Sequence, residues 1–296
     1  MSVVTNRRRT LDALISGVIA LVAVTSATAL TTNPIPPPPV TPVDQVRDTY
    51  HGVKVPDPYR WLEKADDPKV RDWSHAQNER ARHYLDALPF RQAMFDRLMK
   101  QTAATSSSYS DLQVVGDHIF ARYDEPPKQQ QMVAVLGRDL DPAHARVIID
   151  PNTLDPKGST AVDWFVPSPD GKLLAVSMSK NGSEDGSVHV FDVATSKELG
   201  DVIPRVQFPT AGGSLAWHAD SKGFWYTRYP GPERPAAERH FFQKLYSHNL
   251  GEDPARDTYV LGKDFPRIAE IALDGSQNSQ YVVLSVANGD GGQYAH

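Results

Sequence analysis

Ser214 is the residue whose surroundings come closest to a catalytic motif. It lies in Gly212-Gly213-Ser214-Leu215-Ala216, which differs at one position from the Gly-x-Ser-x-Gly turn that presents the nucleophile of α/β-hydrolases. That turn needs a strand before it and a helix after it. Here Ser214 is followed by Trp217-His218-Ala219-Asp220, which is typical of a strand that runs into a tight turn. The sequence therefore argues against Ser214 as a nucleophile and predicts no catalytic residue in this chain.

Other catalytic and metal-binding chemistries find no support in the sequence. The chain contains no Cys, which excludes disulfides, thiolate metal sites and a cysteine nucleophile. It has no zinc-peptidase, P-loop or dinucleotide-binding motif, and its acidic glycine-rich stretches lack the spaced carboxylates of a calcium loop. His189 and His248 occupy similar strand positions in neighbouring predicted repeats, which favours a structural or surface role over metal binding. We therefore expect no metal and no cofactor.

The composition is that of a folded protein without a nucleic-acid partner. Of the 296 residues, 40% are hydrophobic and 23% charged, which is enough apolar surface for a sizeable core. The formal net charge of -5 gives no basic surplus to attract nucleic acid. The length corresponds to about two domains, and the 24 Pro argue against a helical bundle.

Residues 1–29 have the organisation of a signal peptide. Three Arg (7–9) precede an apolar stretch over 13–24, and Ala27-Thr28-Ala29 supplies the small residues of a cleavage site. The apolar stretch is too short to cross a hydrocarbon core of roughly 30 Å. We expect export to the periplasm or the medium without stable membrane insertion; the alternatives are an uncleaved anchor and a mis-assigned start of the sequence. Arg8-Arg9-Thr10-Leu11 loosely resembles a twin-arginine signal but Asp12 fits that pattern poorly, so both export routes stay open.

A proline-rich linker over 30–42 and a helical segment over 43–105 follow. The linker favours polyproline II, which joins neither sheet nor helix. Asp67-Pro68 is a helix start with Asp as N-cap. Residues that are mostly apolar or aromatic then recur at helical spacing and predict a core-facing stripe: Val70, Trp73, Gln77, Ala81, Tyr84 and Leu88. After Pro89, a second short helix is expected around 94–99.

The remaining segment, 106–296, changes to a period of two and repeats itself. Gly, Asp, Asn and Pro turns separate short strands, and the turns at Asp117, Asp170, Asp220 and Asn278 are spaced by about 50 to 58 residues. Four short antiparallel strands in such a repeat are typical of a β-propeller blade, with a β-sandwich as the alternative. Three blades are expected at 109–155, 160–204 and 206–262, and a fourth begins at Phe265. The sequence thus predicts a mainly β fold of about three and a half blades.

One segment resembles a known family. Asp57-Pro58-Tyr59-Arg60-Trp61-Leu62-Glu63, with Tyr50-His51-Gly52 before it, closely resembles the start of the prolyl oligopeptidases, a family of serine peptidases. The likeness continues through 168–171, 206–208 and 282–285. The resemblance implies an α/β-hydrolase domain capped by a seven-bladed propeller, with 43–105 packed on the hydrolase domain and 106–296 as an incomplete propeller.

The same resemblance implies a function and one binding residue. The family hydrolyses short proline-containing peptides after proline, and its propeller gates access to a Ser/Asp/His triad. The triad would lie beyond His296, so this chain is expected to be a fragment, inactive alone, whose intramolecular partner is the missing hydrolase domain. Phe208 matches an aromatic that lines the pocket for the residue two before the cleaved proline, with an ordinary core role as the alternative. Ala287 stands near a position where the family places a binding arginine. A non-catalytic propeller that binds other proteins is the alternative function.

Overall fold

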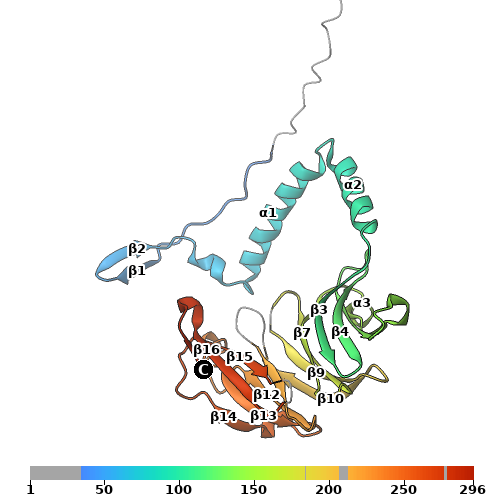
Figure 1. Cartoon of the computed structure of the whole chain (residues 1–296). Helices are drawn as coiled ribbons and strands as arrows, with labels where there is room; N and C mark the ends of the chain where they lie inside the picture. The colour runs from blue at the N-terminus through green and yellow to red at the C-terminus, as the bar shows by residue number, and fades with distance from the viewer. Residues whose placement is uncertain (1–34, 184, 207–212, 277–278) are drawn as a thin grey trace, which may run out of the picture. The chain divides into compact units, whose positions relative to one another are not determined.

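The fold is described from a computed structural model that covers residues 35–183, 185–206, 213–276 and 279–296. The chain divides into two compact units between Leu98 and Met99. Figure 1 shows the helices near the N-terminal end of the described chain and the sheets that follow them. The predicted signal peptide, 1–29, lies outside the described residues.

The first unit begins with a small hairpin. Strands β1 (Arg47–Tyr50) and β2 (Val53–Pro56) pair antiparallel, with Tyr50 opposite Val53. The two turn residues, His51 and Gly52, both have positive φ, at 50° and 82°. A two-residue hairpin with this conformation matches the right-handed twist of its strands. The 3₁₀ turn η1 (Arg60–Glu63) follows.

Two helices follow, and the first begins where the sequence predicted it. In α1 (Pro68–Asp86), the side chain of Asp67 accepts a hydrogen bond from the backbone N–H of Lys69, and Pro68 occupies the first turn. The helix α2 (Arg91–Ala103) exposes apolar side chains along its length, with 50% of Phe95 and 56% of Leu98 accessible. In the described part of the chain, no helix has the length and apolarity that a membrane span requires.

The proline-rich segment lies against α1, which the sequence did not predict. The indole nitrogens of Trp61 and Trp73 donate to the Pro42 carbonyl at 2.8 Å and the Thr41 hydroxyl at 2.9 Å, and Arg80 Nε donates to the Pro36 carbonyl at 2.7 Å. The predicted stripe on α1 is mostly half-buried rather than fully buried in the described chain, and its packing on a hydrolase domain stays a prediction. Trp73 is half-buried, and part of its cover is the extended chain at Thr41, which has no ladder hydrogen bonds of its own.

The second unit consists of four sheets built from consecutive strands. The first sheet contains β3 (Ser108–Val115), β4 (His118–Asp124), β5 (Met132–Gly137) and β6 (Arg146–Ile149), and the second β7 (Thr160–Pro167), β8 (Leu173–Lys180), β9 (Ser187–Asp192) and β10 (Lys197–Pro204). The third contains β11 (Leu215–Trp217), β12 (Gly223–Arg228), β13 (Lys244–Asn249) and β14 (Thr258–Leu261), and the fourth β15 (Ala269–Gly275), β16 (Val282–Asn288) and β17 (Tyr294–Ala295). The short connections include α3 (Pro151–Leu154), η2 (Pro142–His144), η3 (Ala236–Glu238), η4 (Pro254–Arg256) and η5 (Gly289–Gly291).

Each sheet is an antiparallel meander whose strands follow chain order from one edge to the other. This is the topology of a propeller blade, so the prediction of a mainly β fold with blades in this order is confirmed. Strands of this kind can be predicted because their side chains alternate between two faces, while Gly and Asp turns separate them.

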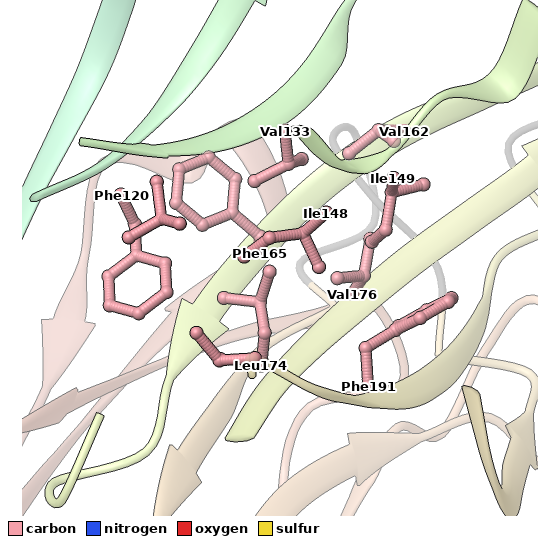
Figure 2. Close-up of a cluster of buried hydrophobic side chains, with 11 residues drawn as sticks. Phe120, Val133, Ile148, Ile149, Val162, Phe165, Leu174, Val176 and Phe191 are labelled. Carbon is pink, nitrogen blue, oxygen red and sulfur yellow. The ribbon is translucent and has the colours of Figure 1, made fainter. Parts of the chain in front are cut away.

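Apolar layers between consecutive blades form the core. Between the first and second blades, Phe120, Val133 and Ile149 pack against Phe165, Leu174 and Phe191 (Figure 2). Phe224 and Tyr226 of the third blade form the next layer with Val188 and Ile203 of the second. A smaller layer joins the third and fourth blades, where Leu245 and Ala216 pack with Leu273. Each blade is therefore stabilised mainly by the blade next to it.

Polar contacts also connect neighbouring blades. Gln113 Nε2 donates to the Phe165 carbonyl at 3.1 Å, and Trp217 Nε1 donates to the Val166 carbonyl at 3.0 Å. These donors reach backbone carbonyls of β7 from the first strands of the blades on either side. These hydrogen bonds connect β3 and β11 to β7. The three strands contribute residues to the candidate site.

Candidate functional site

The first strands of all four blades line one cavity of about 560 Å³. Its wall comes from the ends of β3, β7, β11 and β15 and from the turns after them. Its lining includes Gln113, Val115, Pro167, Ala216, Asp274 and Ser276. Each of these strands is the first of a meander, so one propeller axis brings together residues that are far apart in the sequence.

The turn after β7 shows how the cavity wall is fixed locally. Ser168 Oγ donates to Asp170 Oδ1 at 2.7 Å and accepts the backbone N–H of Leu173 at 3.0 Å. Burial raises the pKa of Asp170, but hydrogen bonds from Ser168 and the Lys172 N–H outweigh burial and lower it below its ordinary value. The Asp170 N–H in turn reaches Ser221 Oγ of the third blade at 3.3 Å. An ionised carboxylate therefore holds the turn, and the turn contacts the next blade.

The described lining of this cavity offers polar groups that are suited to binding. Its described lining offers the carboxylate of Asp274, the amide of Gln113 and the hydroxyls of Ser276 and Ser279, but no His, Lys or Arg. Nucleophilic catalysis by a hydroxyl needs a base within hydrogen-bond reach. The lining can instead offer polar groups and apolar surface to an extended chain.

Ser214 serves a structural purpose in the described chain. Its Oγ accepts the backbone N–H of Leu273 at 2.9 Å, and its own N–H donates to Thr227 Oγ1 at 2.9 Å. The next residues form β11, a strand rather than a helix. The prediction that a strand follows Ser214 is confirmed, and the Ser214 side chain connects the third blade to the fourth.

The binding residue predicted from the family resemblance, Phe208, lies outside the described residues. Val206, two positions before it, is fully buried and packs in the layer between the second and third blades. Ala287, at the position related to the family arginine, is 7% exposed on β16, where it pairs with Glu270 and Tyr294.

A buried polar cluster between the second and third blades was not predicted. His248 on β13 is fully buried; its Nδ1 lies 2.7 Å from Asp257 Oδ1 and its Nε2 lies 3.1 Å from Asp201 Oδ1. Burial lowers the pKa of His248, but the hydrogen bonds with Asp257 and Asp201 outweigh burial and raise it. Tyr226 donates its hydroxyl to Asp257 Oδ2 at 2.6 Å, and burial raises the pKa of that phenol. The sequence predicted a structural or surface role for His248, and full burial with these contacts gives it the structural one.

The fold and this cavity define the class: the chain forms consecutive blades of a β-propeller whose first strands line one cavity of about 560 Å³. The profile described as "Prolyl oligopeptidase, N-terminal beta-propeller domain" matches residues 38–294. The chain belongs to this family.

Named relatives and solved structures agree with this assignment. The chain is 30% identical over 253 residues to the prolyl endopeptidase of Elizabethkingia meningoseptica, covering 83% of this chain and 34% of the relative. It is 28% identical over 265 residues to the dual function macrocyclase-peptidase POPB of Galerina marginata, covering 80% and 35%. A structure from a study of two prolyl endopeptidases superimposes with a TM-score of 0.75 at 29% identity, covering 84% of this chain and 36% of that one. Galerina marginata prolyl oligopeptidase B, bound to a 25mer macrocyclization substrate, gives a TM-score of 0.67 at 27% identity, covering 84% and 37%.

The matched relatives are much longer than this chain. The chain spans about a third of the length of the curated relatives it matches. The activity of a whole prolyl endopeptidase therefore comes to this chain as a proposal.

Proposed function

We propose that this chain is the propeller portion of a serine-type prolyl oligopeptidase that hydrolyses short peptides after proline. The observation that carries the proposal is the cavity of about 560 Å³ lined by the first strand of every described blade, in a chain of this family. The alternative is that this chain is a non-catalytic scaffold that binds other proteins. Activity measurements distinguish the two functions.

The role of the propeller is to select substrates by size. A cavity of this volume accommodates a few residues of extended peptide, since small-molecule sites are typically about 300–1,000 Å³. A folded domain is far too large to enter. Among the described lining residues, Asp274 carries the single charged side chain, so a peptide can pass without a strong preference for charge.

The bond-breaking chemistry belongs to an α/β-hydrolase region that this chain serves. There a Ser attacks the prolyl carbonyl, a His acts as general base, an Asp orients the His, and hydrogen-bond donors hold the oxyanion. The chain needs no cofactor for this role and is inactive alone. Residues 43–105 would pack on that region, for which the exposed apolar side chains of α2, Met94, Phe95, Leu98 and Met99, offer a surface. Residues 1–29 would direct export before they are removed.

The proposed selection by size is tested at Asp274, in the protein joined to a hydrolase region. Asp274→Trp adds bulk to the cavity, whereas the matched control Asp274→Asn removes only the charge. We expect Asp274→Trp to lower kcat/KM for peptides of ten residues or more by roughly tenfold, with a smaller effect on a dipeptide substrate. Asp274→Asn should change neither value. If Asp274→Trp had the same kcat/KM as the wild type for the long peptide and for the dipeptide substrate, the cavity would have no role in substrate access.

A further inference from the structure

A second pocket lies where the second and third blades meet. Its volume is about 320 Å³. Asp185 and Ser187 reach it from the connection into β9, Pro204 and Arg205 from the end of β10, and Arg239 and His240 from the long connection between β12 and β13. None of these six residues lines the cavity of the first strands.

The acidic side chain of this pocket has an ion-pair partner, whereas one of its arginines has none among the described residues. His240 Nε2 lies 3.3 Å from Asp185 Oδ1, so the one carboxylate among the described lining residues has a partner. Arg239 is exposed, and among the described residues its guanidinium has no ion-pair partner. Arg205 and Arg239 against Asp185 leave the lining positive at neutral pH. Arg239 supplies the charge that no described carboxylate offsets.

The backbone holds Arg205 in a fixed position. Arg205 has φ 64°, a left-handed conformation that costs free energy for a residue with a side chain. Its Nε donates to the Tyr229 carbonyl at 3.1 Å, and the Tyr229 N–H donates back to the Arg205 carbonyl at 3.1 Å. Gly231 lies beside the guanidinium, and a Cβ there would approach Arg205 Cζ to 3.3 Å and Glu233 Oε2 to 2.7 Å. Strained residues held this firmly are concentrated at functional sites.

The connection that carries Arg239 is also anchored. Phe242 has φ 62°, and its N–H donates to the Arg267 carbonyl at 2.8 Å. The guanidinium of Arg234 lies 3.9 Å from the centre of the Phe242 ring, and Arg234 pairs with Glu238 at 2.8 Å. The residues on both sides of Arg239 are therefore fastened, while its own guanidinium is free to take a ligand.

We propose that this pocket binds a carboxylate group of a peptide, with Arg239 as its ion-pair partner and Arg205 as a second, preorganised donor. A guanidinium matches the planar geometry of a carboxylate and can bind it through two parallel hydrogen bonds. The volume suits a terminal or side-chain carboxylate rather than a whole peptide. The choice of a peptide as the ligand rests on the proposed function; the anion preference rests on the pocket alone.

Three peptides distinguish the source of the carboxylate. The first is acetyl-Gly-Pro-Ala-Ala with a free C-terminus, the second is its C-terminal amide, and the third is the amide with Glu as the last residue. Each is titrated into the ¹⁵N-labelled 296-residue chain, and binding is followed by NMR through the backbone N–H signal of His240, which the wild type and both variants share. We expect the free acid, the Glu peptide or both to bind roughly three- to tenfold more tightly than the plain amide.

Two variants decide whether Arg239 is responsible. Arg239→Gln should remove the preference for the carboxylate, whereas Arg256→Gln should preserve it because Arg256 lies beyond the opposite end of β13. Equal binding of acid and amide by the wild type would overturn the proposal, as would an equal loss in both variants. Binding of no peptide would also overturn it, while the proposed function is decided separately by cleavage in the protein joined to a hydrolase region.

Discussion

The Nε2 atom of His248, on the third blade, lies 3.1 Å from Oδ1 of Asp201, on the second blade, and both side chains are buried. Asp201 also accepts the backbone N–H of Gly251 at 2.6 Å. Because Nδ1 of the same imidazole faces Asp257, both ring nitrogens donate when the ring is protonated. The imidazolium between two carboxylates thus connects the two blades through charge as well as through apolar packing.

This arrangement makes the stability of the propeller depend on pH. The pKa of His248 is raised above 6.5 by its carboxylate partners, despite burial, so the folded state holds the proton more tightly than the unfolded state. Its contribution is full below about pH 6.5 and is lost as the pH rises through the raised pKa of the folded state. We expect His248→Gln to cost about 3–5 kcal/mol near pH 6 and less at pH 9, in urea unfolding.

The matched control for this prediction is His189→Gln. His189 also faces a carboxylate, with Nδ1 2.6 Å from Glu198 Oε1, but Glu198 is 42% exposed at its side chain. Exposed pairs contribute about 0–1 kcal/mol, so the control should have a much smaller effect. A cost for His248→Gln that stays constant from pH 5 to 9 would show that the charge on the imidazole does not stabilise the fold.

The apolar layer between the first two blades should be the most sensitive to truncation. Phe165 is 1% exposed within it, whereas Phe90, just before α2, is 52% exposed. Phe165→Ala removes buried apolar contacts and leaves a cavity, so we expect a loss of about 3–5 kcal/mol in the free energy of unfolding. Phe90→Ala should change the stability by no more than about 0.5 kcal/mol. Similar values for the two variants in urea unfolding would contradict the assignment of this layer as the core.

The blades could be predicted from sequence because their signals are local. Alternating side chains define each strand, and the Asp- and Gly-containing turns define where it ends. The partners of His248 could not be predicted in this way. Asp257 is 9 residues away and Asp201 is 47 residues away, and only the packing of one blade on the next brings them together.

The candidate sites also depend on contacts between residues that are far apart in the sequence. The cavity of the first strands follows from the blade order, but the pocket at Arg239 depends on the folded path of the connection between β12 and β13, which has no periodic pattern. On α1, the apolar stripe indicated a covered face correctly, yet its spacing did not reveal that Thr41 and Pro42 would supply part of the cover. Phe208 was assigned from the resemblance, and its role stays a prediction.

Exposed apolar side chains on two blades predict self-association. Leu112 on β3 is 59% exposed, and Val283 on β16 is 52% exposed. Apolar residues on exposed strands favour pairing between molecules. We expect the 296-residue chain to form oligomers in sedimentation velocity, and the double variant Leu112→Lys/Val283→Lys to shift it toward monomer. A wild-type chain that is already a uniform monomer would contradict this expectation.

Export makes a separate prediction about the mature N-terminus. With residues 1–29 acting as a signal peptide, the exported protein should begin at or near Leu30. Intact-mass measurement of the secreted product checks this directly. Soluble, non-exported protein that retains Met1 would count against a signal peptide.

The central claim is that this chain is the non-catalytic propeller portion of a prolyl oligopeptidase. The most direct measurement is the hydrolysis of a prolyl-chromophore substrate by the chain alone and by the chain joined to the part of the Elizabethkingia meningoseptica prolyl endopeptidase that follows the matched segment. The account predicts hydrolysis after proline by the joined protein, none by the chain alone, and no loss of that activity in a joined protein carrying Ser214→Ala. Hydrolysis by the chain alone that disappears in Ser214→Ala, or a cooperatively folded joined protein without activity, would contradict it.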